Sequence, residues 1–191
     1  IVYAPNKHIY MQSLDDMRER TIVCNSLSKT YSITGWRLGY VIANPQIIDR
    51  VKKVHDFLTV GAAAPLMEAA VVGLEFGDGY YDELAAHYAH MKEVFVGGLK
   101  KLGLKYTDPQ GAYYVLVDVS EFGVKDDVKF CEWMAQYVGV AAVPGSSFFR
   151  EDVHNLVRFH FAKQDDTLNE AIKRLETLKE KAMNAKNVNW R

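Results

Sequence analysis

Two short apolar runs near the start of the chain have the pattern of β-strands. Thr21–Asn25 and Leu38–Ala43 are rich in β-branched and other apolar residues, as buried strands are. The segment between them, Ser26–Arg37, has no helical period and is short for a parallel crossover. We therefore expect antiparallel strands. We also expect this loop to lie at the strand ends, where open α/β sheets bind their ligands.

The apolar positions that follow recur at helical spacing. A helix is predicted to begin at Asn44-Pro45, because asparagine caps helix N-termini and proline is favoured in the first turn. Its apolar face is formed by Ile47, Val51, Val54 and Leu58. A shorter helix is predicted from Pro65 to about Phe76.

Glycines at Gly77–Gly79 interrupt the helical pattern and predict a joint between two domains. We expect residues 1–77 to form the end of an α/β domain and residues 78–191 to form a smaller α+β domain. A long amphipathic helix follows the joint. Its apolar face is traced by Tyr81, Leu84, Tyr88, Met91, Phe95 and Leu102.

The rest of the chain alternates short strands with helices, which is typical of an α+β domain. Strands are predicted at 111–119, 140–145 and 156–162. A helix face between them is formed by Val128, Cys131, Met134 and Val138. The last helix is predicted to open at the capping box formed by Thr167 and Glu170.

Composition and charge narrow the classes of function. The 191 residues carry a net charge of −1, which provides no basic field for nucleic acid or for an anionic membrane. No apolar run is long enough to span a bilayer, and no signal peptide is visible. Cys24 and Cys131 lie in apolar contexts, so we expect both to be reduced core residues of a cytoplasmic protein.

One segment carries chemistry rather than packing. It contains Ser26, Ser28, Lys29, Gly35, Arg37, Gly39 and Tyr40. This pattern resembles the lysine motif of class I/II aminotransferases, the aspartate-aminotransferase-like enzymes of fold type I that use pyridoxal 5'-phosphate (PLP). The resemblance extends over essentially the whole chain. It implies the C-terminal part of the fold type I architecture: the end of a large mixed-sheet α/β domain, followed by a small α+β domain.

The resemblance assigns the catalytic role to Lys29. A lysine amine is a nucleophile only when unprotonated, a state that a dry cleft near other cations favours. Lys29 would then form a Schiff base with the aldehyde of PLP and move a proton at the substrate carbon. A solvated loop lysine is the alternative that the motif argues against.

Three neighbours of Lys29 match the family's cofactor-binding positions. Arg37 has the planar guanidinium that suits phosphate oxygens. Ser26 adds a neutral hydroxyl donor, and Ser28 either does the same or satisfies the backbone. Gly35 and Gly39 either let the backbone turn and approach its neighbours closely, or are ordinary loop glycines.

A second anchor lies far along the chain. Strand alternation sets Arg158 and His160 on one face and the apolar residues on the other. The resemblance implies that Arg158 grips the α-carboxylate of an amino-acid substrate; a structural ion pair is the alternative. Tyr113, together with the turn near Ser146 and Phe148, would line the entrance of the cleft; their alternative is a role as core or turn residues.

Other polar pairs predict no chemistry. His87 and His90 have a spacing that could hold a metal, but no third ligand is visible and we expect surface residues. The paired acids at 15–16, 126–127 and 165–166 fit helix starts. We therefore predict no metal site and no catalytic carboxylate pair.

Several elements of the family pattern have no match in these 191 residues. They are an aspartate for the pyridine nitrogen, a tyrosine for the phenolic oxygen, an asparagine beside the ring and further phosphate ligands. We expect them to precede Ile1 in a longer chain. Residues 1–191 alone are therefore expected to bind PLP poorly and to be inactive.

The resemblance implies transfer of an amino group between an amino acid and a 2-oxo acid in two half-reactions, in a homodimer. The segment from Lys52 to Pro65 has no arginine to match a dicarboxylate-specific side-chain site, which favours neutral or aromatic amino acids. Two other functions stay open at this point: a β- or γ-lyase on the same scaffold, and an aminotransferase-like sensor domain of a transcription regulator.

Overall fold

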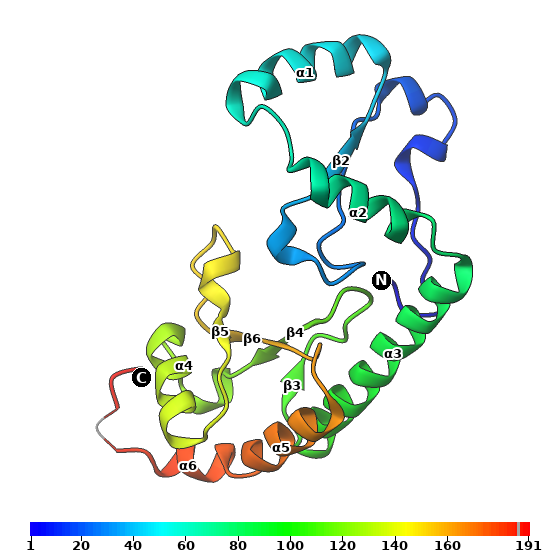
Figure 1. Cartoon of the computed structure of the whole chain (residues 1–191). Helices are drawn as coiled ribbons and strands as arrows, with labels where there is room; N and C mark the ends of the chain where they lie inside the picture. The colour runs from blue at the N-terminus through cyan, green and yellow to red at the C-terminus, as the bar shows by residue number, and fades with distance from the viewer. Residues whose placement is uncertain (187) are drawn as a thin grey trace. The chain divides into compact units, whose positions relative to one another are not determined.

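A computed structural model describes residues 1–186 and 188–191 (Figure 1). The chain divides into two compact units, His8–Tyr81 and Ile1–Lys7 with Asp82–Arg191. The first seven residues therefore pack with the later unit, where Val2 pairs with Gly111, although the sequence placed them in the earlier domain. The division into domains 1–77 and 78–191 stays a prediction.

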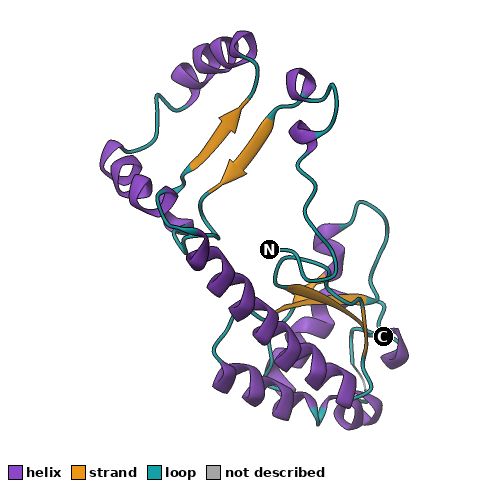
Figure 2. Cartoon of the chain, turned by 90° about the vertical axis from the view of Figure 1, so that its right-hand side faces the viewer, coloured by secondary structure: helices purple, strands orange, loops and turns teal. Residues whose placement is uncertain are grey.

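The earlier unit is built from short elements. They are η1 (Met11–Ser13), η2 (Arg18–Arg20), β1 (Val23–Ser26), η3 (Thr34–Trp36), β2 (Gly39–Ile42), α1 (Pro45–Leu58) and α2 (Ala64–Leu74), with the first turn of α3 (Asp78–Lys101). Strands β1 and β2 pair antiparallel, with Ser26 opposite Gly39, as the short connection predicted (Figure 2). Asn44 caps α1 through its side chain, as predicted.

Burial in this unit differs from the sequence expectation. Strand β1 is mostly exposed, so Cys24 is an exposed thiol rather than a core residue. Helix α1 has its predicted period but no buried residue, and Phe57 is 93% exposed. The physical reason is that a sheet face becomes buried only when a second layer covers it, and the buried cluster of this unit contains only Leu27, Leu38 and Ala70.

The described residues of the later unit form one antiparallel sheet and four helices. The strands are β3 (Lys105–Tyr106), β4 (Tyr114–Asp118), β5 (Val143–Pro144) and β6 (Leu156–His160), in the order β3-β4-β6-β5. The helices are the main part of α3, α4 (Asp127–Tyr137), α5 (Asp165–Leu175) and α6 (Leu178–Asn184), with short turns η4 (Ser120–Phe122) and η5 (Gly145–Phe148). The predicted strands and helices of this part are thus all present.

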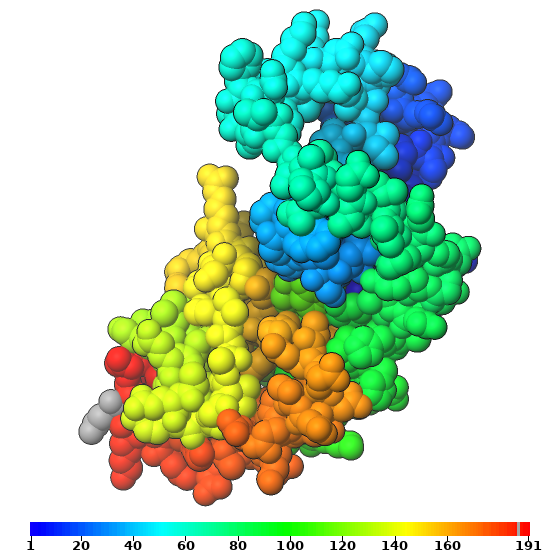
Figure 3. Space-filling view, viewed as in Figure 1, coloured from blue at the N-terminus to red at the C-terminus, as the bar shows by residue number. Residues whose placement is uncertain are grey.

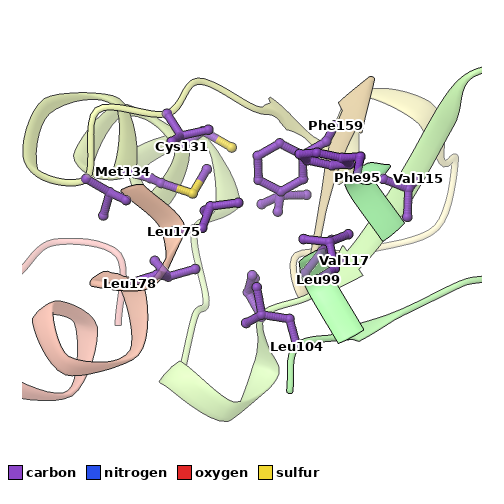
Figure 4. Close-up of a cluster of buried hydrophobic side chains, with 14 of the residues drawn as sticks. Phe95, Leu99, Leu104, Val115, Val117, Cys131, Met134, Phe159, Leu175 and Leu178 are labelled. Atoms are coloured by element: carbon purple, nitrogen blue, oxygen red, sulfur yellow. The ribbon is translucent and has the colours of Figure 1, made fainter. Parts of the chain in front are cut away.

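A dense core joins the sheet to the helices. Side chains from β4 and β6 point toward residues of α3, α4, α5 and α6 (Figure 4). Val115, Val117, Val157 and Phe159 are buried on one sheet face, and each such side chain stabilises the fold by about 1.5–3 kcal/mol. The alternation predicted for β6 is therefore confirmed, and Arg158 lies on the opposite, half-buried face.

The predicted start of the last helix is wrong. Helix α5 begins at Asp165, and its N-cap Gln164 makes no side-chain capping bond, so Thr167 lies inside the first turns. Asp165 and Asp166 instead place negative charge near the exposed N–H groups of the first turn. Glu170, expected to close a capping box, pairs with Arg174 at 2.8 Å.

Helix α4 also departs from its predicted face. Cys131 and Met134 are buried, whereas Val128 is 46% exposed. Within the described part of the chain, no helix is both long and apolar enough to cross a membrane.

Candidate functional site

The loop between β1 and β2 is closed at its base by buried leucines. The N–H of Leu27 donates to the carbonyl of Leu38 at 3.1 Å, and both side chains are buried. At Gly39 the two strands approach so closely that an added Cβ would lie 2.5 Å from the carbonyl oxygen of Asn25. Arg37 has a left-handed backbone with φ 58°, which turns the chain out of η3 and into β2.

Two cationic side chains of this loop converge on one threonine. Lys29 Nζ donates to Thr34 Oγ1 at 3.3 Å, and Arg37 Nη1 donates to the Thr34 carbonyl at 2.9 Å. Among the described residues, neither cation forms an ion pair with a carboxylate. Lys29 is exposed here, rather than enclosed in the dry cleft that the sequence led us to expect.

The two serines form a compact hydroxyl pair beside the lysine. Ser26 Oγ donates to Ser28 Oγ at 2.8 Å, and the N–H of Ser28 donates back to Ser26 Oγ at 3.2 Å. Ser28 is buried, and Ser26 is the more exposed of the two. Ser26, Ser28, Lys29 and Arg37 are thus gathered in one loop, as the motif required.

Three tyrosines support this loop, a role that sequence reasoning gave to none of them. Tyr80 donates its hydroxyl to the carbonyl of Thr30 at 2.6 Å, and its ring stacks on that of Tyr31 at 5.9 Å. The hydroxyls of Tyr31 and Tyr81 lie 2.8 Å apart. Burial, and then the bond with Tyr81, raises the pKa of Tyr31 to about 12, so its hydroxyl stays protonated. The only signal in the sequence was a Tyr-Tyr pair at the start of the long helix.

The later unit carries a second cationic site. The guanidinium carbon of Arg158 lies 3.6 Å from the ring centre of Phe148 and 4.2 Å from that of Tyr114. Arg158 forms no ion pair with a carboxylate in the part of the chain that the structure describes. The structural ion pair considered as an alternative for Arg158 is therefore not observed among these residues.

Of the two adjacent tyrosines, Tyr114 packs on Arg158, and the role of Tyr113 at the entrance of the cleft stays a prediction. Tyr113 stacks on Tyr88, with ring centres 5.6 Å apart, and accepts a hydrogen bond from Tyr114 Oη at 3.3 Å. Burial and this hydrogen bond raise the pKa of the Tyr113 hydroxyl. Tyr113 is therefore linked to Arg158 through its neighbour.

A buried carboxylate of the later unit was also missed by sequence reasoning. Asp127 was predicted only to start a helix, but Asp126 is the N-cap of α4 and Asp127 is 0% exposed. Its two carboxylate oxygens accept from the N–H of Ser146 at 2.8 Å and from His154 Nδ1 at 2.9 Å. Burial acts to raise the pKa of Asp127, but the bonds from His154 and Ser146 outweigh it and lower the value. No sequence pattern distinguishes these two adjacent aspartates.

The paired histidines are not gathered into a metal cluster. His90 lies 2.8 Å from Asp165, and this bond raises the pKa of His90. The described residues contain no group of three or more potential metal-ligating side chains.

Comparison with known proteins agrees with the motif. The family model described as aminotransferase class I and II matches residues 2–175. The methionine aminotransferase of Escherichia coli is 35% identical over 179 residues, covering 93% of this chain and 46% of the relative. The aspartate aminotransferase of Pyrococcus horikoshii is 33% identical over 178 residues, covering 92% of this chain and 44% of the relative.

A solved structure matches to a similar extent. The N-succinyldiaminopimelate aminotransferase from Mycobacterium tuberculosis superposes with a TM-score of 0.86 at 32% identity, covering 93% of this chain and 47% of that protein. This chain spans about half the length of the curated relatives it matches. Members of this family use pyridoxal 5'-phosphate, and the match has the fold type I architecture. The chain belongs to the class I and II aminotransferases.

Proposed function

We propose that the full-length protein is a PLP-dependent aminotransferase, which transfers an amino group between an L-amino acid and a 2-oxo acid by a ping-pong mechanism. The observation that carries the proposal is the loop in which Lys29, Arg37 and Ser26 present an amine, a guanidinium and a hydroxyl together. A guanidinium and a hydroxyl can donate hydrogen bonds to a phosphate, and an amine can attack an aldehyde as a nucleophile.

The residues of the loop fit the cofactor. Arg37 and Ser26 bind phosphate oxygens in our proposal, and no carboxylate of the described residues pairs with Arg37 in competition. Because Gly39 has no side chain, β1 and β2 can approach closely enough to hold the loop in this shape. When bound, PLP supplies an aldehyde for covalent attachment and an electron sink for the substrate α-carbon.

Each residue then has a defined task. Lys29 carries the cofactor and afterwards takes up and returns the proton at the α-carbon as general base and acid. Thr34 holds the lysine amine on the same side of the loop as the guanidinium, through its side chain and its carbonyl. Ser28 steadies Ser26 through the hydroxyl pair, so its role in cofactor binding is indirect.

Arg158 is the proposed anchor of the substrate α-carboxylate. Its guanidinium lies against the rings of Phe148 and Tyr114 and pairs with no carboxylate of the described residues, so its N–H groups can donate bidentately to a substrate carboxylate. Tyr113 is proposed to line the same site through its contact with Tyr114.

The proposal includes a substrate class, an assembly and a location. The substrate has a neutral or aromatic side chain, since the segment 52–65 offers no arginine for a second carboxylate. The protein acts as a homodimer, which rests on the family alone. It works in the cytoplasm, which the two free cysteines support.

The first experiment locates the covalent bond. The full-length protein is incubated with PLP, reduced with borohydride and digested, and the modified peptide is identified by mass spectrometry. We expect the label on Lys29, and we expect Lys29→Ala to lower the transamination rate by at least about 10³-fold. Lys53→Ala is the matched control and should retain full activity. A label on another lysine, or an active Lys29→Ala protein, would refute the proposal.

A second assay separates aminotransferase from lyase chemistry. Transamination requires a 2-oxo acid and releases no ammonia. Methionine, phenylalanine and aspartate are compared as amino donors, and kcat/KM is expected to be lowest for aspartate. Release of pyruvate and ammonia from a β-substituted amino acid without any 2-oxo acid would instead identify a lyase.

A further inference from the structure

Phe148 contacts Arg158 from a loop whose conformation depends on contacts with residues outside the loop. The segment joins β5 to β6, and the ring of Phe148 is 45% exposed even though it lies against the guanidinium. The yellow residues of this segment stand out from the surface of their unit in the space-filling view (Figure 3). A ring this exposed gains little from burial, so its position depends on what fixes the backbone beneath it.

The start of the segment is fixed by close packing. The backbone of Gly145 lies so near β6 that an added Cβ would be 2.4 Å from the carbonyl oxygen of Leu156. β5 pairs with β6 only through Val143 and Pro144, after which the ladder stops. Beyond this point the segment has no strand partner.

Asp127 joins the two ends of the segment from outside it. One carboxylate oxygen accepts the Ser146 N–H at the start, and the other accepts from His154 Nδ1 near the end. The opposite nitrogen of His154 lies 2.7 Å from Asp152 within the same segment. A single buried carboxylate therefore closes the loop that carries Phe148.

Helix formation does not account for this carboxylate. Asp126 already caps α4, accepting from the N–H of Lys129 at 3.0 Å, so the adjacent Asp127 is not needed as a cap. Burying a charge is costly unless hydrogen bonds compensate it. Two of the compensating donors, the Ser146 N–H and His154 Nδ1, come from the loop, alongside the backbone N–H of Asp127 itself, which indicates that the carboxylate stabilises the loop.

We propose that Asp127 is a positioning residue for the Arg158 site: by binding Ser146 and His154, it holds the loop in the shape that lays Phe148 on the guanidinium. Phe148 in turn keeps the guanidinium in one orientation. The identity of the ligand as a substrate carboxylate rests on the proposed function, whereas the link from Asp127 to Phe148 and Arg158 does not.

Kinetics of the full-length protein test the consequence for substrate binding. Asp127→Ala is expected to raise KM for amino donors about 10-fold or more while kcat changes less than about threefold, because the α-carboxylate is held in the ground state and the transition state alike. Asp126→Ala is the matched control: it removes a helix cap and lowers stability, but should leave KM within about twofold. Asp127→Asn retains one acceptor oxygen and should give an intermediate KM, and it serves if the alanine variant does not fold.

A double-mutant cycle tests the route through the ring. Phe148→Ala should raise KM by a similar factor, and the Asp127→Ala, Phe148→Ala protein should be no worse than the poorer single variant. Additive effects would overturn the proposal, as would an unchanged KM in Asp127→Ala.

Two readouts do not depend on activity. Amide hydrogen exchange of Ser146–Phe148, and the reactivity of Arg158 with phenylglyoxal, should both rise about 10-fold or more in Asp127→Ala and stay near wild type in Asp126→Ala. An inactive wild-type protein that shows these changes would refute the proposed function and support the positioning role. Equal values in the two aspartate variants would refute the positioning role even in an active aminotransferase.

Discussion

The two cationic sites of this chain are built in opposite ways. The loop from Ser26 to Arg37 gathers its groups from consecutive residues and rests on a buried cluster of three small or medium side chains. The Arg158 site draws one residue each from β4, β6 and η5, and it is supported by the large core of its unit. A site made of contiguous residues can be read from a motif, whereas one assembled across strands depends on register and packing.

The means of fixing each cation also differ. In the loop, the cations are positioned by backbone geometry, namely the left-handed conformation of Arg37 and the close approach of the two strands at Gly39. At Arg158, two aromatic rings and a buried carboxylate do it through side chains. Substitutions at the two sites should therefore differ in whether added cofactor restores activity.

The largest expected effect compares the two arginines. Arg37→Gln and Arg158→Gln should each lower kcat/KM by about 10²–10³-fold, because each removes a charge-assisted, paired contact. Only the Arg37 variant should recover when PLP is raised to saturation, since Arg158 is proposed to bind substrate instead. Activity assays across PLP and substrate concentrations check this. Arg50→Gln on the exposed surface is the control. Rescue of the Arg158 variant by PLP would contradict the assignment of Arg37 to the cofactor and Arg158 to the substrate.

The next effect tests the backbone support of the loop. Gly39→Ala should lower the free energy of unfolding by about 1–3 kcal/mol and weaken PLP retention, because its Cβ would lie 2.5 Å from the Asn25 carbonyl. Gly35→Ala is the matched control, since a Cβ there meets nothing within 4 Å. Chemical denaturation and PLP titration of both variants measure the difference. Equal losses would mean that the close approach at Gly39 is unimportant.

A smaller effect concerns pH at the other site. Hydrogen bonds to Asp127 and then Asp152 raise the pKa of His154, so the folded protein holds that proton more tightly than the unfolded chain. The stabilisation is therefore complete below about pH 6.5 and is lost as pH rises through the folded-state pKa. The Tm difference between wild type and His154→Gln should be larger at pH 6 than at pH 9.

A matched change controls for general effects of pH. His87→Gln alters a histidine on α3 that forms no ion pair with any described carboxylate. Its Tm difference should be small at both values. The lowered pKa of Asp127 sets the acid limit: its stabilising contribution is complete above the ordinary pKa of an aspartate and is lost as pH falls through the lower folded-state pKa, where the carboxylate takes up its proton and the pairing with His154 weakens. A His154→Gln difference that does not depend on pH would contradict this account.

The smallest effect should come from Thr34. Thr34→Val removes the hydroxyl that accepts from Lys29 and donates to the Ser28 carbonyl at 3.3 Å, but it keeps the carbonyl that accepts from Arg37, so a loss of about three- to tenfold in kcat is expected. Thr34→Ser retains a hydroxyl and should stay near wild type. Steady-state kinetics of both variants provide the measurement, and equal rates would show that the hydroxyl does not position the lysine.

Sequence reasoning recovered what local rules determine. The short link Ser26–Arg37 was sufficient to predict antiparallel strands, and alternation along β6 placed Arg158 opposite the core. The lysine motif gathered in one loop because its residues are neighbours in the chain. Asparagine followed by proline marked the start of α1 correctly.

The misses have a common physical cause: each depends on partners that the linear pattern does not specify. Asp126 and Asp127 are identical in type, and only the tertiary fold decides which caps the helix and which is buried. Cys24 was expected to be buried because its neighbours are apolar, but its strand lacks a covering layer in this chain. Thr167 and Glu170 match a capping box, yet two acidic residues upstream already begin the helix.

The guanidinium of Arg158, flanked by two rings and by no acidic side chain of the described residues, has a consequence for solution conditions. A fixed positive group without an internal counter-ion attracts whatever small anion the medium supplies. Chloride, sulfate or phosphate is then expected to bind its N–H groups and to compete with the carboxylate of the proposed substrate, so buffer anions become a variable of every assay of this site.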